Sequence, residues 1–338
     1  IFRLQGHRRG ENNRRGVIMK LTNEDLKELQ EKSLSEKIEI SRTILQDYYK
    51  KTNGKIYVAF SGGKDSVVLL DIVRSVYPNT IGVYSNTGLE YPEIVEFVKT
   101  VPNIQIIRPK VSFKEVIQKH GYPVFSKKIS RMVSIIQNPT ERNHKTRKLY
   151  IEGVNSNGIK SPNWKIPDKY LYLIDAPFKM SDACCKYLKK APFQNFEAET
   201  KMNRILGLMA IDGEYRKYSI KKRGFNHYAE RNNYSTPLGF WTRSDVWEYI
   251  YKNKLPYCKV LYGDIILQKT LDGNAVYNND GLYGTGCMFC MFGIEQENKL
   301  KRPNRFQLMK ETHPKLYKYC MDDLGIQKVL EYIKIPYR

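Results

Sequence analysis

One short glycine-containing stretch constrains the fold of this chain more than any other feature of its sequence. Residues 61–66 read Ser-Gly-Gly-Lys-Asp-Ser, between the apolar run 56–60 and the apolar-periodic segment 67–73. This order predicts a strand, a tight turn and a helix, which together aim several backbone N–H groups and a helix N-terminus at one point. Two adjacent glycines let the backbone approach an anion without a Cβ in the way. The stretch therefore predicts a phosphate-binding loop.

The side chains of this loop add donors and charge to the backbone groups. Lys64 supplies a positive charge, and the hydroxyls of Ser61 and Ser66 supply hydrogen-bond donors. The pattern is not the G-x-x-x-x-G-K-[ST] cradle for β- and γ-phosphates. Asp65 could orient Mg²⁺ if the nucleotide is ATP, or it could simply be an acidic residue in the first turn of a helix. The predicted nucleotide-binding residues of the loop are Ser61, Gly62, Gly63, Lys64, Asp65 and Ser66.

Strand and helix patterns alternate after a first segment of one or two amphipathic helices within residues 23–50. The alternating elements are strands at 55–60, 81–85 and 104–107, and helices at 65–76, 91–100 and 112–119. The pattern predicts an α/β fold: a parallel sheet with helices on both faces and the nucleotide at the carboxyl ends of the strands. The later elements expected are a helix at 181–190, a buried strand at 204–211, a helix at 243–253 and a helical C-terminal extension.

We expect four parts along the chain. These are a disordered leader at 1–18, N-terminal helices at 19–50, a main domain at 51–293 and the helical extension at 294–338. Met19 is a candidate start. The main domain carries two insertions, near 138–170 and near 263–280, which are rich in Lys, Asn and Gly and are expected to be surface loops.

Four of the six cysteines form two close pairs, Cys184-Cys185 and Cys287-x-x-Cys290. No signal peptide or long apolar run is evident, so we expect a cytoplasmic chain with reduced thiols and no membrane partner. Reduced cysteine pairs more often bind metal or carry out redox chemistry than form disulfides. Four thiolates suit a zinc ion or a [4Fe–4S] cluster, and the diverging side chains of a vicinal pair favour the cluster. Cys258 and Cys320 have no partner at such a spacing.

These motifs together resemble the iron–sulfur type of the adenylylsulfate/phosphoadenylylsulfate (APS/PAPS) reductase family, within the PP-loop ATP pyrophosphatase superfamily. The likeness runs from about residue 38 to about residue 293. The segments that carry it, besides the loop and the cysteine pairs, are Thr87-Gly88 with Pro92-Glu93, Lys189 to Pro192, Trp241 to Ile250, and Tyr283 to Cys287.

The resemblance implies an adenine nucleotide as ligand and a [4Fe–4S] cluster on Cys184, Cys185, Cys287 and Cys290. It also implies that Thr87 and Gly88 line the adenosine site. For catalysis we assign to Lys64 and Arg216 the role of stabilising the negative charge that develops as the α-phosphate or sulfate bond breaks. Lys189 and Lys190 could bring positive charge between cluster and anion.

The chain departs from the family pattern at functional positions. The reductases use a C-terminal cysteine within Glu-Cys-Gly-x-His, whereas Cys320 stands in a predicted helix without that motif. In the segment G-x-R-x-x-E-S-x-x-R, Met209 and Asp212 replace the first arginine and the glutamate, although Arg216 remains. Loss of a guanidinium weakens the case for sulfate or 3′-phosphate recognition. Because the chain lacks the C-terminal cysteine motif, a sulfur donor or reductant protein is a candidate partner.

The net charge of +22 (57 Lys and Arg against 35 Asp and Glu) exceeds what solubility requires. With 25 tyrosines, it favours a surface that attracts polyanions, so nucleic acid is a candidate partner. Candidate phosphate contacts lie at 127–128, 142–148 and 221–223, although one such run is usually a solvated face. Two alternatives to a reductase stay open: an ATP-dependent tRNA or DNA sulfurtransferase, and a non-catalytic nucleotide- or nucleic-acid-binding module. Trp241 and Trp247 are expected to pack in the core rather than stack on bases.

Overall fold

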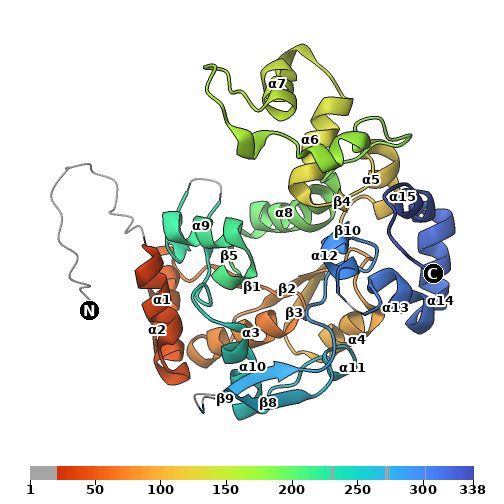
Figure 1. The fold of residues 1–338 in the computed structure, drawn as a ribbon. Helices are drawn as coiled ribbons and strands as arrows, with labels where there is room; N and C mark the ends of the chain where they lie inside the picture. The colour runs from red at the N-terminus through yellow and green to blue at the C-terminus, as the bar shows by residue number, and fades with distance from the viewer. Residues whose placement is uncertain (1–20, 230–231, 271–272, 274, 301) are drawn as a thin grey trace.

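A computed structural model describes residues 21–229, 232–270, 273, 275–300 and 302–338 (Figure 1). The expected leader at 1–18 lies outside these residues. A six-stranded sheet stands at the centre, with strand order β3-β2-β1-β5-β7-β6. All neighbouring strands pair in parallel except β6, which runs antiparallel to β7. The strands are β1 (Ile56–Ala59), β2 (Gly82–Ser85), β3 (Ile104–Ile107), β5 (Asn203–Ile205), β6 (Asn226–His227) and β7 (Tyr234–Ser235). The predicted α/β fold is confirmed.

Helices cover both faces of this sheet, because successive residues of β1 point to opposite sides. Val58 packs in one cluster with Val68 and Leu69 of α3 (Lys64–Val76). Tyr57, on the other side, packs against Phe196 of α8 (Ala191–Thr200). The first face also receives α2 (Leu34–Lys51) and α10 (Arg243–Lys252), while α1 (Asn23–Glu31) and α4 (Pro92–Thr100) lie at the edges of this core. Trp241 and Trp247 are buried in it, as predicted.

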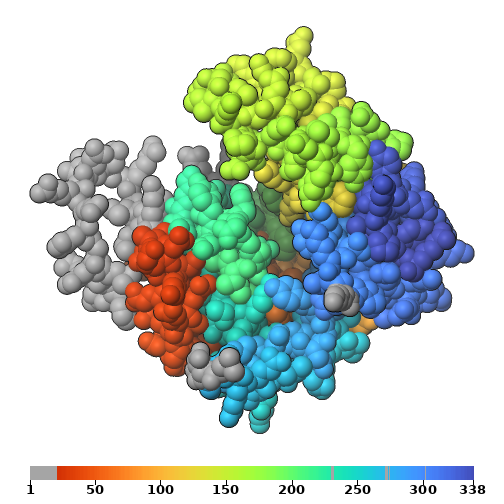
Figure 2. Space-filling view, in the orientation of Figure 1, coloured from red at the N-terminus to blue at the C-terminus, as the bar shows by residue number. Residues whose placement is uncertain are grey.

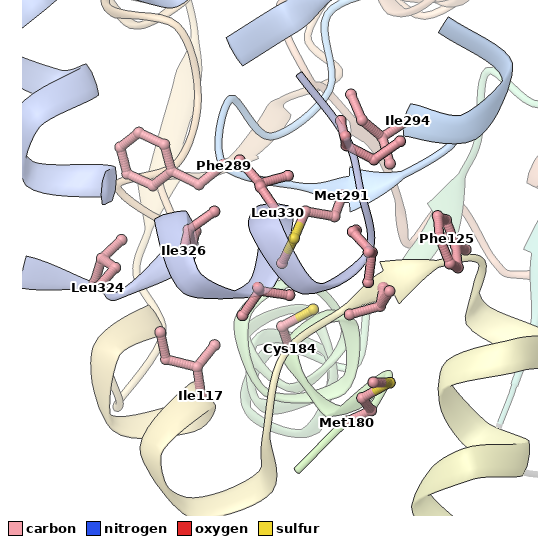
Figure 3. Close-up of a cluster of buried hydrophobic side chains, with 14 of the residues drawn as sticks. Ile117, Phe125, Met180, Cys184, Phe289, Met291, Ile294, Leu324, Ile326 and Leu330 are labelled. Carbon is pink, nitrogen blue, oxygen red and sulfur yellow. The ribbon is translucent and has the colours of Figure 1, made fainter. Parts of the chain in front are cut away.

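A second core joins the C-terminal segment to the middle of the chain. Strands β4 (Val124–Phe125) and β10 (Met291–Phe292) pair in parallel at its centre. Cys184 belongs to this cluster, beside the helix that carries Ile326 and Leu330 (Figure 3). The helices around it are α5 (Phe113–His120), α6 (Lys127–Gln137), α12 (Ile294–Asn298), α13 (Arg305–Thr312), α14 (Pro314–Lys318) and α15 (Ile326–Tyr332). A π-helical turn, Tyr319–Asp323, stands between α14 and α15. The C-terminal extension is therefore helical, as predicted.

Three local predictions were wrong. The strand expected at 204–211 ends at Ile205, because the chain then crosses the start of α3, where a Cβ on Gly207 would lie 3.2 Å from the Asp65 carbonyl oxygen. The insertion near 138–170 holds α7 (His144–Glu152) and is anchored by the buried Tyr150 and Ile166. The insertion near 263–280 forms an antiparallel hairpin of β8 (Ile265–Lys269) and β9 (Ala275–Asn279). Apolar residues in both insertions provide the packing that a surface loop lacks.

Within the part of the chain that the structure describes, every helix is too short or too polar to span a membrane.

Candidate functional site

The predicted phosphate loop follows β1 and ends as the first turn of α3. Gly62 has φ +72°, and a Cβ there would lie 2.8 Å from side-chain methyl carbons of Ile94 and Val98 in α4. Only glycine combines this left-handed backbone with such close packing. Gly63 is the N-cap of α3, and its N–H lies 3.3 Å from Ser61 Oγ, the acceptor. The loop therefore presents the α3 N-terminus at the carboxyl end of β1.

The side chains of the loop are held close to one another. Ser66 Oγ lies 3.1 Å from Ser61 Oγ and donates to the Gly63 carbonyl at 2.8 Å. Lys64 is buried, and its Nζ donates to Asp65 Oδ1 at 2.7 Å. One ammonium, one carboxylate and two hydroxyls thus share a small volume at the start of a helix. Such a group suits an anion, or an anion with a cation on Asp65.

Two residues that the sequence analysis did not single out cover the loop. Tyr262, at the end of α11 (Lys259–Tyr262), accepts a hydrogen bond from the Lys64 N–H at 3.4 Å. Its hydroxyl also lies 3.0 Å from Thr285 Oγ1. A Cβ on Gly63 would come within 3.3 Å of both oxygens. One signal for these two residues was present in the sequence: Thr285 lies within the Tyr283-to-Cys287 segment that carries the family resemblance.

The four predicted metal-ligating cysteines line one pocket. Cys184 and Cys185 come from the start of a π-helical turn, Cys185–Lys190, and Cys287 and Cys290 come from the loop before β10. The rest of the lining is Leu89, Phe113, Pro123, Leu188 and Lys189. The helix expected at 181–190 is present from Ala183, is wound as a π-helix over Cys185–Lys190 and continues into α8.

The thiols of this pocket differ in acidity. The pKa of Cys185 is lowered to about 6, first by a hydrogen bond from Cys184. Burial opposes this shift, and the charges of Lys127 and Lys189 add to it. The pKa of Cys184 is raised, first by that same hydrogen bond. Burial raises the pKa of Cys287, and burial together with Cys287 raises that of Cys290 to about 11. The charges of Lys127 and Lys189 therefore favour the thiolate form of Cys185.

Lys189 lies in a recess that solvent reaches, at the mouth of this pocket. Burial opposes its charge, but Cys287 and Glu90 outweigh burial and raise its pKa. Glu90 also accepts hydrogen bonds from the Thr87 N–H at 3.0 Å and from the Thr87 hydroxyl at 2.8 Å. Gly88 has φ +74° and open space around it. The predicted adenosine-lining pair thus adjoins a carboxylate that sequence reasoning missed.

The chemistry of the pocket can be compared with what a zinc ion and a cluster each require. Among the described residues, no group of three His, Cys, Asp or Glu side chains is arranged to hold one metal ion. A zinc ion about 2.3 Å from each sulfur would draw four thiolates to within about 4 Å of one another. A [4Fe–4S] cluster places iron and sulfide between its thiolates and needs a wider spacing. Four thiols around one recess, with two lysines to balance their charge, fit that group.

The phosphate loop and the cysteine pocket adjoin each other. Thr285 contacts the loop through Tyr262, and Cys287, two residues later, lines the pocket. Two extended residues span at most about 7 Å. On the β2 side, the Ser85 hydroxyl donates to the carbonyl of Leu188, which also lines the pocket, at 3.3 Å. Both features therefore lie at the carboxyl ends of β1 and β2.

Two arginines stand near the loop. Arg216, in α9 (Glu214–Arg223), is half-exposed and hydrogen-bonds to Asp212. Arg243 approaches Asp212 from the first turn of α10, with Nη2 3.5 Å from Oδ1, and its guanidinium lies 3.3 Å from the ring centre of Tyr283. Burial lowers the pKa of Arg243, while Asp212 and Asp65 oppose this change. The sequence analysis missed Arg243, a guanidinium within electrostatic reach of the loop although Met209 replaces the family arginine.

Comparison with known proteins finds a matching family model and relatives of low sequence identity. The family model described as the phosphoadenosine phosphosulfate reductase domain matches residues 55–290. Adenosine 5'-phosphosulfate reductase of Bacillus cereus is 26% identical over 221 residues, covering 64% of this chain and 71% of the relative. An uncharacterized protein of Methanocaldococcus jannaschii is 24% identical over 270 residues, which are 76% of this chain and 41% of that protein.

Solved structures show more distant likenesses. The phosphoadenylyl-sulfate reductase of Candida auris, in a phosphate complex, aligns with TM-score 0.36 and 18% identity over 72% of this chain and 94% of its own. The U34-tRNA thiolase NcsA of Methanococcus maripaludis, with its [4Fe-4S] cluster, aligns with TM-score 0.28 and 14% identity over 86% of this chain and 80% of its own.

Proposed function

This chain belongs to the phosphoadenosine phosphosulfate reductase domain family, and from that premise we propose that it binds an adenine nucleotide and acts in sulfonucleotide reduction or sulfur transfer beside a [4Fe–4S] cluster. One observation carries the proposal. The loop at 61–66, predicted to bind phosphate, lies next to a pocket of four thiols, since Thr285 contacts Tyr262 over the loop and Cys287, two residues later, lines the pocket. An anion held by the loop would face the charges around the thiols.

The loop would hold the phosphate or sulfate end of the nucleotide. The N–H groups at the start of α3 and the hydroxyls of Ser61 and Ser66 donate to anionic oxygens. Lys64 and Arg243 would stabilise negative charge on the leaving phosphate as its bond to sulfur breaks. Arg216 would act with them, because its half-exposed guanidinium can leave the Asp212 carboxylate and bind the substrate anion instead. Thr87 and Gly88 would line the adenosine.

Cys184, Cys185, Cys287 and Cys290 would hold the cluster. When bound, such a cluster supplies a centre whose charge and reduction potential depend on the groups around it. Lys189, close to Cys287 and Glu90, and Lys127, close to Cys185, would offset the negative charge of the thiolates. The lysines would thereby let a second anion, the substrate, lie nearby.

The thiol that attacks sulfur would come from a second molecule. Cys320 is fully buried, which raises its pKa, and Cys258 is also buried. A thiolate of a partner dithiol protein would attack the sulfonate sulfur and form an S–S bond. The S–O bond to the nucleotide would break, and AMP or its 3′-phosphate would leave with the electron pair. The second thiol would then release sulfite and close a disulfide.

The test is a reaction panel on protein purified under anaerobic conditions, with iron and sulfide measured in each preparation. We expect sulfite and AMP, or its 3′-phosphate, from a sulfonucleotide only when a dithiol protein such as thioredoxin is present. Nucleotide binding without turnover of any substrate would instead identify a non-catalytic module.

A second candidate is an ATP-dependent sulfurtransferase that acts on a nucleic acid. One observation favours it: Asp65 beside Lys64 could place Mg²⁺ on ATP. In the same panel, this function would appear as conversion of ATP to AMP that rises when RNA or DNA is added.

A further inference from the structure

Helix α9 contributes little to the core and is exposed or partly exposed over most of its length. Among its ten residues only Ile220 is buried, whereas a helix that packs on a core normally buries a whole apolar stripe. Five of the ten residues are Lys or Arg, and Glu214 is the only acidic residue. In Figure 2 the helix forms part of the teal surface below the yellow-green lobe. A cationic helix face is therefore open to solvent.

Two tyrosines lie within this basic face. Tyr215 is 81% exposed and Tyr218 is 60% exposed. The Lys222 ammonium lies 5.7 Å from the centre of the Tyr218 ring. A solvated basic helix requires no exposed aromatic rings. Rings alternating with cations are the arrangement on which unpaired bases stack while phosphates contact Lys or Arg.

The exposed face of α9 leads toward the predicted phosphate loop. Arg216 of α9 pairs with Asp212, and Arg243 approaches the same carboxylate from the other side. Arg243 lies over the ring of Tyr283, which is 61% exposed. Basic and aromatic groups therefore continue from α9 to the residues beside Asp65.

We propose that Tyr215, Tyr218 and the cations of α9 form a binding surface for single-stranded nucleic acid at the rim of the candidate active site. The tyrosines stack on unpaired bases, and Lys222, beside the Tyr218 ring, contacts phosphate. A duplex hides its base faces and leaves the rings without a partner. The net charge of +22 favours approach of such a strand. The surface operates without nucleotide turnover and stands apart from the proposed reaction.

Fluorescence anisotropy of a labelled single strand, without nucleotide, tests this surface. RNA and DNA of one sequence are compared with their duplexes. We expect Tyr215→Ala and Tyr218→Ala each to weaken single-strand binding about fivefold or more, and Tyr→Phe at either position to keep it. Lys222→Ala should lower the slope of log affinity against log salt by about 0.7. Either RNA or DNA bound in this way supports the proposal.

Tyr251→Ala is the matched control, because Tyr251 is 56% exposed but lies in the last turns of α10. It should bind like the parent protein. Three results would each overturn the proposal and show non-specific attraction of anions. They are normal binding by both alanine variants of α9, equal weakening by Tyr251→Ala, and competition by polyglutamate as strong as that by RNA. Because no nucleotide is present, failure here leaves the sulfur-transfer assay unaffected.

Discussion

At the scale of single residues, the candidate site depends on positions where one side chain is permitted or one charge is concentrated. Gly62 combines a left-handed backbone with close packing on α4, and Lys64 is a buried ammonium beside one carboxylate. Their sequence context indicated a phosphate loop. The neighbours Tyr262 and Arg243 arrive from more than a hundred residues away, so no pattern near the loop indicates them.

Gly62→Ala should destabilise the protein and abolish nucleotide binding. A left-handed backbone costs alanine about 1–2 kcal/mol, and the 2.8 Å contacts with Ile94 and Val98 add overpacking of about 1–3 kcal/mol. Urea denaturation measures the free energy of unfolding. Gly158→Ala is the control, since Gly158 has φ +76° with nothing within 4 Å. Equal losses in the two variants would show that packing on α4 does not constrain the loop.

Lys64→Ala should weaken adenine nucleotide binding by about 1.5–3 kcal/mol, the range of a hydrogen bond to a charged group. Calorimetric titration with ATP and with a sulfonucleotide measures the effect. Lys99→Ala, which removes an exposed partner of Glu96, should leave affinity unchanged. Unchanged affinity in Lys64→Ala would remove this residue from the site.

At the scale of elements, α2 and α10 are joined by a buried ion pair on one side of the sheet. Lys37 Nζ lies 2.6 Å from Asp245 Oδ2, and the side chains are 2% and 11% exposed. The same carboxylate accepts the Thr242 N–H at 2.6 Å in the capping box of α10. Asp245 therefore fixes the helix whose first residue is Arg243.

Lys37→Met should cost about 3–5 kcal/mol in the free energy of unfolding, because it leaves the Asp245 carboxylate buried without its partner. Lys99→Met, which breaks an exposed pair, should cost less than about 1 kcal/mol. Thermal and urea unfolding of both variants make the comparison. Similar losses would mean that solvent reaches the Lys37 pair.

At the scale of the whole molecule, the cysteine pocket joins segments from distant parts of the chain. The π-helical turn brings Cys184 and Cys185, and the loop before β10 brings Cys287 and Cys290. From the C-terminal extension, Arg305 of α13 donates to the Cys290 carbonyl at 2.9 Å. Any group bound by all four thiols would therefore stabilise the packing between these segments.

Protein purified under anaerobic conditions should be brown, with broad absorbance near ~400 nm, and should contain iron and sulfide. Cys185→Ser and Cys287→Ser should remove most of the iron and lower the melting temperature, while Cys258→Ala should keep the iron. Metal analysis and thermal unfolding measure both effects. A colourless preparation with one zinc ion would contradict this prediction.

The sequence by itself determined the features that depend on neighbouring residues. These are the strand, loop and helix around 56–73, the strand–helix alternation that builds a parallel sheet, and the close spacing of the cysteines in two pairs. Short-range periodicity and glycine chemistry suffice for these. It misjudged the insertions, because Tyr150 and Ile166 pack into a core that is assembled from segments far apart along the chain. Only the tertiary structure decided that Thr285 lies at the predicted phosphate loop, that Arg243 is within electrostatic reach of Asp65, and that Arg216 of α9 shares Asp212 with Arg243. Each arrangement arises from packing between segments whose separation no local pattern encodes.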